Sequence, residues 1–196
     1  MTTFHDLPSA LEAGVANVRR LIADANRTPA WEGWPDELWT LTELEELRLN
    51  QGRLSKVPSA IGRLTKLRVL ELAFRFQFFE PGLGELANLR ELIIRGPAPL
   101  LKPDLAKLSL ERLTIAADWT DSAVIIARIP VTKNVTLTGN HPMAAEDLER
   151  EDLSAWRDLE ELEIDAWEDF EPTVFARKLP KCGFAINRKR RVDWSI

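Results

Sequence analysis

The feature that most constrains this chain is a repeated pattern, L-x-x-L-x-L, with leucine or isoleucine at its first, fourth and sixth positions. Clear copies start at Leu44, Leu67, Leu89 and Leu110, in steps of 23, 22 and 21 residues, and another starts at Leu159. Alternating apolar residues are typical of a strand, and one short strand cannot bury its apolar side alone. Stacking successive strands in parallel gives each repeat a neighbour on both sides. The pattern therefore predicts a solenoid.

Weaker copies extend the series. One copy reads Thr132, Val135 and Leu137, and imperfect terminal copies read Val18, Leu21, Ala23 and Lys181, Phe184, Ile186. With these included, the sequence predicts about eight turns, each contributing one strand to a parallel sheet.

The segment before each pattern predicts the outer wall of the solenoid. Pro35 and Pro58 each lie nine positions before the next repeat, at Leu44 and Leu67. Proline is tolerated in the first turn of a helix, so a short helix or 3₁₀ segment is expected there. Residues 57–64 read V-P-S-A-I-G-R-L, and with the strand pattern they resemble the intracellular class of the leucine-rich-repeat family.

That resemblance implies an α/β fold: a right-handed curved stack with about eight parallel strands on the concave face and short helices or 3₁₀ turns on the convex face. Members of the family are binding scaffolds. We expect one domain, with a helical cap over 1–17, the solenoid over 18–180 and a C-terminal strand and cap over 181–196. The cap helix is predicted to run from Leu7 to Val18, with Ser9 as its N-cap and Glu12 completing a capping box. An insertion at 141–158 is predicted to be one longer convex helix, with Trp156 in the place of Leu41, Leu64 and Leu86 in other repeats.

Composition narrows the class of partner. A net charge of −5 and a pI near 5.2 argue against general binding of nucleic acid or anionic membranes. The N-terminus lacks the basic and apolar regions of a secretory signal, no window is apolar for the roughly 18 residues that a membrane helix needs, and a single cysteine suits a reducing compartment. We therefore expect a cytoplasmic protein that binds a protein or peptide; the alternative is a secreted bacterial effector whose repeats engage a host protein. The sequence does not specify an oligomeric state.

The third, fifth and seventh residues of each repeat are predicted to point out of the concave face and to bind the partner. Val69 and Ile93 are expected to be exposed apolar anchors, and Glu161, Glu163 and Asp165 to form an acidic end that favours a basic element. The alternative is a sheet face that is merely solvated. The full predicted binding set is Arg48, Val69, Glu71, Glu91, Ile93, Arg95, Arg112, Thr114, Thr136, Glu161, Glu163 and Asp165. Most of the four phenylalanines in residues 74–79 are expected to pack in the core, one or two of them in the position that Leu54 fills one repeat earlier; Phe74 and Phe76 are the candidate loop anchors.

Residues that would support catalysis are scattered. The two histidines, His5 and His141, are far apart, and no metal-binding, phosphate-binding or nucleophile motif occurs. We expect Cys182 to be an inert apolar residue and the basic run 188–191 to be a solvated edge of the end cap, partly neutralised by the acidic stretch 158–171. The chain is thus predicted to be no enzyme and to need no cofactor and no metal.

Overall fold

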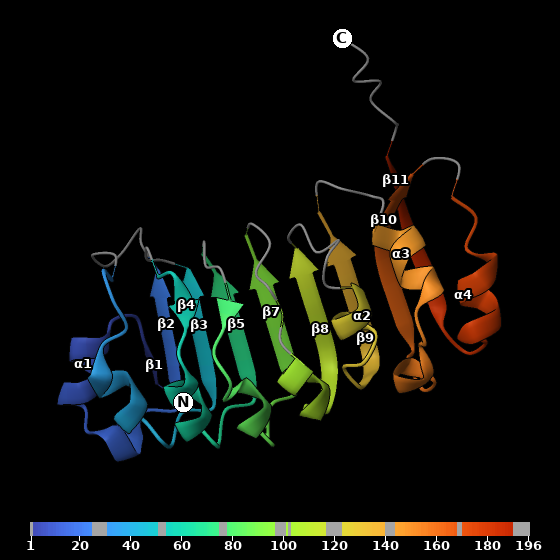
Figure 1. Ribbon diagram of the computed structural model, residues 1–196. Coiled ribbons are helices and arrows are strands. Elements are labelled where there is room, and N and C mark those ends of the chain that lie inside the picture. Colours follow the sequence, from blue (N-terminus) through green and yellow to red (C-terminus); the bar gives the residue numbers. More distant parts are fainter. Residues whose placement is uncertain are drawn as a thin grey trace, which may run out of the picture.

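Nine parallel strands form one sheet in the computed structural model, which describes residues 2–24, 31–50, 54–74, 78–96, 101, 103–116, 123–139, 144–167 and 170–189. The strands lie side by side in chain order (Figure 1). They are β1 (Thr3–Phe4), β2 (Arg20–Asp24), β3 (Glu46–Asn50), β5 (Val69–Ala73), β7 (Glu91–Arg95), β8 (Leu110–Ala116), β9 (Val131–Thr138), β10 (Glu161–Trp167) and β11 (Gly183–Lys189). The parallel sheet predicted from the repeats is confirmed, with one strand more than expected because Thr3–Phe4 pairs with β2.

The repeat leucines stack into a continuous core. Leu47, Leu70, Leu92 and Leu113 are register partners on successive strands, and all four are fully buried. The sixth-position residues, from Leu49 to Ile115, form a second buried row beside them. The strands from β2 to β10 thus bury one set of alternate side chains between the sheet and the outer wall, as the spacing of the pattern predicts.

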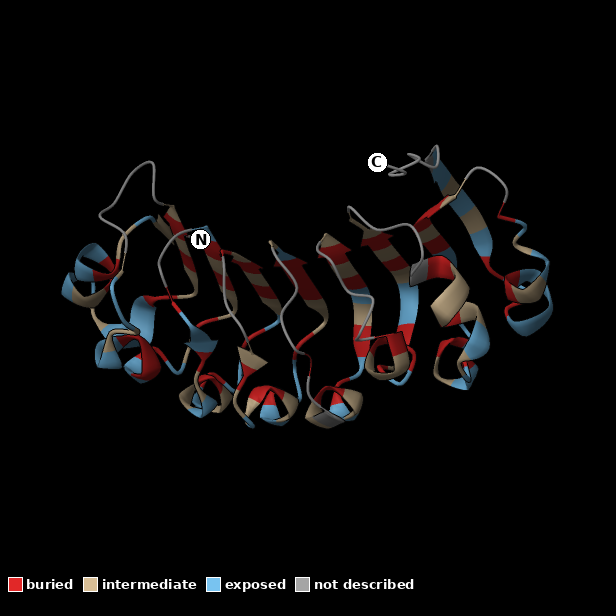
Figure 2. Cartoon of the chain, turned by 45° about the horizontal axis from the view of Figure 1, so that its top comes forward, coloured by how far each residue is buried: buried red, intermediate tan, exposed pale blue. Residues whose placement is uncertain are grey.

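The outer wall consists of short helical segments along the convex side of the arc (Figure 2). They are η1 (Val15–Asn17), η2 (Asp36–Thr40), η3 (Ser59–Arg63), η4 (Leu83–Glu85), η5 (Pro103–Lys107), α2 (Ala123–Ile126), α3 (Ala144–Arg150), η7 (Ser154–Trp156) and α4 (Thr173–Lys178). Pro35 and Pro58 lie at the N-caps of η2 and η3, in extended conformation, where the missing N–H group costs nothing.

The N-terminal helix differs from the sequence prediction. The helix α1 (Leu7–Glu12) ends well before Val18, and a 3₁₀ turn follows Gly14, whose φ of 86° breaks the helix. Its N-cap is Asp6 and not Ser9: the Asp6 carboxylate accepts a hydrogen bond of 2.7 Å from the Ser9 N–H. Pro8 in the first turn fits this start, because proline needs no acceptor there.

The weak repeat has a different first residue from the one predicted. Val131, and not Thr132, is buried opposite Leu110, and pairing then resumes between Arg112 and Asn134. One additional residue therefore lies in β9, and both Thr132 and Lys133 are exposed. Such a bulge leaves the later core positions, starting with Val135 beside Leu113, in register.

The insertion is two short segments and not one longer helix. The helix α3 ends at Arg150, and Asp152 then accepts a hydrogen bond from the Ser154 N–H, which starts η7. The predicted place of Trp156 is confirmed: it is fully buried, and its indole N–H donates to the Ile129 carbonyl at 2.8 Å. This tryptophan fills a position where a leucine suffices in the shorter repeats.

An aromatic cluster closes the loop side of the early repeats. The two-residue strands β4 (Lys56–Val57) and β6 (Phe78–Phe79) pair in parallel, and Phe79 is fully buried. Phe74 contacts the Trp34 ring edge-on at a centroid distance of 6.0 Å, and the Trp34 N–H donates to the Lys56 carbonyl at 2.6 Å. These contacts connect successive loops at the edge of the solenoid where the strands end.

Candidate functional site

The concave face is built from alternate residues of the strands. The register places one side chain from each strand, from β2 to β10, into each of two parallel rows, because residues at equal repeat positions are paired. The third-position row runs Arg20, Glu46, Val69, Glu91, Arg112, Asn134 and Glu161, and the fifth-position row runs Ile22, Arg48, Glu71, Ile93, Thr114, Thr136 and Glu163. The predicted binding residues of these rows therefore do lie together on one surface.

The charges in the N-terminal half of this surface pair with one another. Arg48 forms ion pairs with Glu46 at 2.5 Å and with Glu71 at 2.6 Å. Glu46 also pairs with Arg20 at 2.6 Å, and Glu71 with Arg95 at 3.0 Å. Burial would lower the pKa of the Arg48 guanidinium, but its hydrogen bonds to Glu46 and Glu71 raise that pKa above its ordinary value. We call this series, from Arg20 to Arg95, the concave ion-pair ladder.

The exposure predicted for Ile93 is wrong. Its exposed fraction is 6%, although it points out of the concave face and lies outside the main core cluster. Glu71 and Thr114 flank it on the neighbouring strands, and the Arg95–Glu71 ion pair runs beside it. Long charged side chains cover neighbouring apolar surface with their methylene stems, which explains the burial.

Val69 is the more accessible of the two predicted anchors. It is half-buried in a hollow of about 250 Å³. The other residues that line this hollow are Arg20, Glu45, Glu46, Arg68, Arg90, Glu91, Glu111 and Arg112. An apolar floor thus lies within a ring of charged side chains of both signs, and Arg112 and Glu91 in that ring approach to 3.9 Å.

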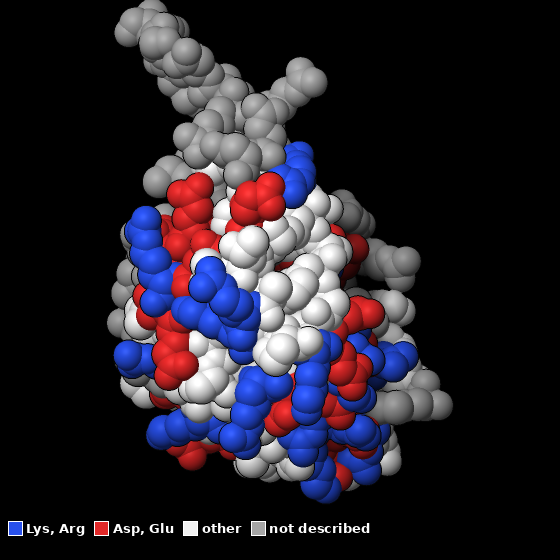
Figure 3. All heavy atoms as spheres, turned by 90° about the vertical axis from the view of Figure 1, so that its right-hand side faces the viewer, with Lys and Arg blue, Asp and Glu red and all other residues white. Residues whose placement is uncertain are grey.

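The C-terminal end of the face is acidic and hollowed. Glu161 and Glu163 line a hollow of about 300 Å³ together with Gly183 and Ala185, whose small side chains leave space beside them. Glu163 accepts hydrogen bonds from Asn187 at 3.0 Å and Thr136 at 3.5 Å, and within the described ranges neither glutamate forms an ion pair with Lys or Arg. Seen end-on from the β11 side, this end of the stack presents uncharged surface among side chains of both charges (Figure 3).

Asp165 differs from the other predicted acidic residues. Its exposed fraction is 7%, and its carboxylate accepts a hydrogen bond of 3.0 Å from the Gly139 N–H. Asp165 therefore stabilises the end of β9, and the prediction that it is part of an open acidic surface is wrong. The sequence shows only that a carboxylate lies two residues beyond Glu163. That spacing does not tell whether the carboxylate binds a neighbouring loop or is exposed to solvent.

The candidate loop anchors and the cysteine are placed as follows. Phe74 has an exposed fraction of 7% and packs against Trp34, so the prediction that it is an exposed anchor is wrong; Phe76 lies outside the described residues. Cys182 is buried, and burial raises the pKa of its thiol to about 11. A thiol with that pKa is almost entirely protonated at neutral pH and is a poor nucleophile.

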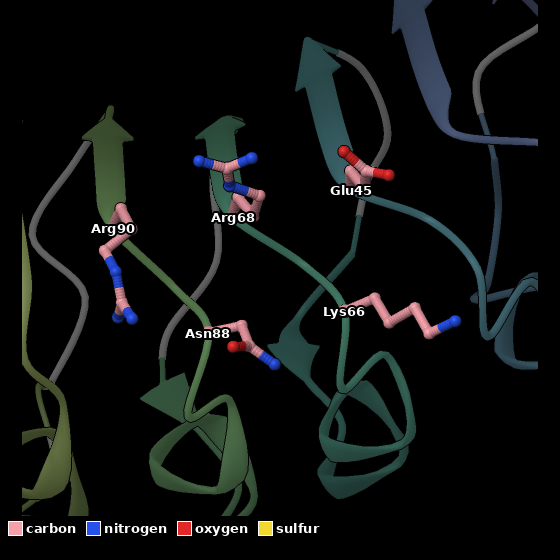
Figure 4. A pocket seen from close by; sticks show the side chains of 5 residues that line it. All are labelled: Glu45, Lys66, Arg68, Asn88 and Arg90. Carbon is pink, nitrogen blue, oxygen red and sulfur yellow. The ribbon is translucent and has the colours of Figure 1, made fainter.

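A third hollow, which the sequence analysis missed, lies where β3, β5 and β7 begin. Its volume is about 400 Å³, and it is lined by Glu45, Lys66, Arg68, Asn88 and Arg90 (Figure 4). These residues immediately precede strands or lie in the turns before them, so they form a rim beside the concave face and not part of its floor. The signal was present in the sequence as two arginines, Arg68 and Arg90, at the same repeat position.

Comparisons with known proteins give one similar structure. The sequence matches no protein-family model and no curated protein. Among solved structures, the chain is similar to a leucine-rich-repeat protein of Leptospira interrogans, with 17% sequence identity and a TM-score of 0.43, over 98% of this chain and 72% of that one. The sheet topology and the buried repeat register decide the architecture. The fold is a leucine-rich-repeat solenoid.

Two further observations concern other kinds of site on this solenoid. Across the described ranges, no group of three or more His, Cys, Asp or Glu side chains is arranged to hold a metal ion. In the same ranges, no helix has the length and apolar character needed to span a membrane.

Proposed function

We propose that this solenoid is a scaffold that binds a protein or peptide partner on its concave face. The observation that carries the proposal is the hollow at Val69, which puts an accessible apolar side chain inside a ring of charges. Six of the eight charged residues that line it form ion pairs, two of these pairs within the ring itself. A partner can therefore bury one apolar side chain there while most of the surrounding charges stay paired, which is the usual arrangement of an apolar anchor within a polar rim.

The sheet supports binding in a second way. The side chains of the ladder are fixed by ion pairs on a parallel sheet, so little conformational entropy is lost when a partner orders them. The hollow at Glu161 and Glu163 makes the β10 end of the same face negatively charged. A partner with a basic element would be steered towards that end.

The test uses the full chain as bait in lysate of its source cell, followed by mass spectrometry and by measurement of affinity for the recovered partner. Val69→Glu replaces the apolar floor of the hollow by a carboxylate that an apolar partner side chain would have to desolvate, and we expect the dissociation constant to rise more than about tenfold, or about 1.4 kcal/mol. Val15→Glu is the matched control, because Val15 is an exposed valine, at 42%, in η1 and away from the concave face.

Equal affinities of the Val69→Glu and Val15→Glu proteins, with both shown to be folded by circular dichroism, would contradict binding at this hollow. The acidic end has a separate test. Glu163→Lys is expected to lower the association rate and to weaken its dependence on salt while changing the dissociation rate little. An unchanged association rate would remove the acidic end from the proposed interface.

A further inference from the structure

The residues directly before the first concave position of each repeat form a row of charges along the rim of the solenoid. In register order they are Arg19, Glu45, Arg68, Arg90, Glu111, Lys133 and Glu160, each directly before the first concave residue of its strand. Opposite charges alternate along this rim row except at one place, where Arg68 and Arg90 are neighbours. Adjacent strands are only about 4.8 Å apart, so two like charges there repel unless an anion lies between them.

The carboxylates on either side of these arginines are already engaged elsewhere. Glu45 pairs with Arg19 at 3.6 Å, on its far side from Arg68. Glu111 pairs with Lys133 at 2.6 Å, and the hydrogen bond from Lys133 holds the pKa of Glu111 below its ordinary value. The rim row therefore neutralises itself at both ends and leaves its positive charge at Arg68 and Arg90.

Both arginines have donors to spare. Arg68 is exposed, and within the described part of the chain its guanidinium makes no hydrogen bond and no ion pair. Arg90 is held by one Nη, which donates to the carbonyls of Ala87, Leu89 and Ser109 at 3.2, 3.1 and 3.4 Å. Its other Nη and its Nε remain available. In Figure 4 the Arg68 side chain lies at the start of β5, whereas that of Arg90 extends away from it along the preceding turn.

The hollow between them has the shape of an open trough. The 400 Å³ hollow at Lys66, Asn88 and the two arginines adjoins the 250 Å³ hollow at Val69, because Glu45, Arg68 and Arg90 line both. The Lys66 ammonium is neutralised by both oxygens of Glu43, each at 2.6 Å. An extended ligand can thus run along the rim while one anionic group sits at the arginine pair.

We propose that Arg68 and Arg90 clamp a carboxylate from an acidic peptide segment of a protein partner. Guanidinium groups bind carboxylates through paired N–H···O bonds, and two of them from neighbouring strands that line one hollow can hold one Asp or Glu side chain. A nucleic acid backbone needs several cations in a row for its successive phosphates, and this rim offers two arginines flanked by the Glu45, Glu91 and Glu111 carboxylates. One carboxylate of a peptide needs only the arginine pair. The proposal rests on the proposed function in its premise that the ligand is a protein, and its site adjoins the hollow at Val69, which Arg68 and Arg90 also line.

The test measures fluorescence polarisation of a short fluorescein-labelled peptide of alternating Glu and Gly residues titrated with the full chain. We expect saturable binding that weakens as salt is raised, because exposed charges are screened over about 8–10 Å at 0.1–0.15 M salt. The double variant Arg68→Ala/Arg90→Ala is expected to lose affinity by about tenfold or more. The matched control is Arg63→Ala/Arg128→Ala, which removes the same charge from exposed positions outside the trough and should bind as the parent does.

Three results would overturn the proposal. One is no saturable binding of the peptide, and another is equal loss of affinity in the two double variants, which would make the effect one of net charge. The third is binding of labelled single-stranded DNA more tightly than the peptide, with the same sensitivity to Arg68→Ala/Arg90→Ala. Loss of the recovered partner in Val69→Glu with normal binding of the acidic peptide would separate the two sites, since only the concave face would then be affected.

Discussion

The replacement Trp156→Phe tests the structural role of the Trp156 side chain in the repeat that contains the insertion at 141–158. The Trp156 side chain is fully buried, and its indole N–H is the hydrogen-bond donor to the Ile129 carbonyl. Phenylalanine keeps the apolar contacts of one ring but removes the donor and part of the volume. The variant therefore leaves a buried carbonyl without a partner and a small cavity beside it.

The magnitude follows from these two losses. An unsatisfied buried carbonyl costs about 1–3 kcal/mol. Truncating a whole buried aromatic side chain to alanine costs about 3–5 kcal/mol, so the smaller loss of volume here is set at about 1 kcal/mol. The free energy of unfolding should fall by about 2–4 kcal/mol, which for a chain of this length lowers Tm by roughly 5–15 °C.

The assay is thermal unfolding followed by circular dichroism, with urea denaturation to obtain the free energy. Trp31→Phe is the matched control, because Trp31 is partly exposed and contacts Trp34 only by ring packing, at a centroid distance of 6.3 Å. We expect its effect to stay below about 1 kcal/mol. Equal losses of stability in the two variants would refute the structural role assigned to the Trp156–Ile129 bond.

The remaining predictions concern the leucine core, the Cys182 thiol and the dependence of stability on pH. Leu70→Ala should lower the free energy of unfolding, measured by urea denaturation, by about 2–5 kcal/mol. A loss no larger than that caused by Arg63→Ala, at an exposed position, would contradict the strand register that buries Leu70. Because burial raises the pKa of Cys182 to about 11, the folded protein should react with a thiol reagent at pH 8 far more slowly than the urea-unfolded protein, and equal rates would show an accessible thiolate. Hydrogen bonds from Ser9, and from Lys66 and Arg19, hold the pKa values of Asp6 and Glu43 below their ordinary 3.8 and 4.5. The stability that these two carboxylates contribute is complete at pH values above their ordinary pKa values and is lost as the pH falls through their lowered pKa values. Tm should therefore be level near neutral pH and fall below about pH 4. A rise of Tm below about pH 4 would contradict the direction of these pKa shifts.

The core of this solenoid could be predicted from sequence because its rule is local. Leucines three and five positions after the start of each repeat are enough to place Leu47, Leu70 and Leu92 beside each other. The additional strand β1 was missed because two residues carry no recognisable pattern. The N-cap was misassigned because Asp6 and Ser9 are both good capping residues, and only the backbone conformation decides between them.

The binding surface was harder to predict because burial there depends on neighbours in other repeats. Ile93 is covered by side chains from the adjacent strands, and nothing within its own repeat indicates this. Asp165 was misread for the same reason, because its hydrogen-bond partner, Gly139, belongs to the preceding strand. The rim row was readable, since repeat alignment alone places Arg68 next to Arg90. It was missed because only the residues expected on the concave face were compared across repeats.

The bulge at the start of β9 shows how a surface of this kind can change by insertion. Pairing is interrupted after Leu110 and Val131 and is restored at Arg112 and Asn134, so the additional residue leaves Leu113 and Val135 in place. What the insertion does alter is the rim, where exposed Lys133 becomes the partner of Glu111. Single-residue insertions at the entrance of a strand can therefore exchange one rim charge for another while every core leucine keeps its neighbours. At this strand, the rim charge is thus set separately from the core.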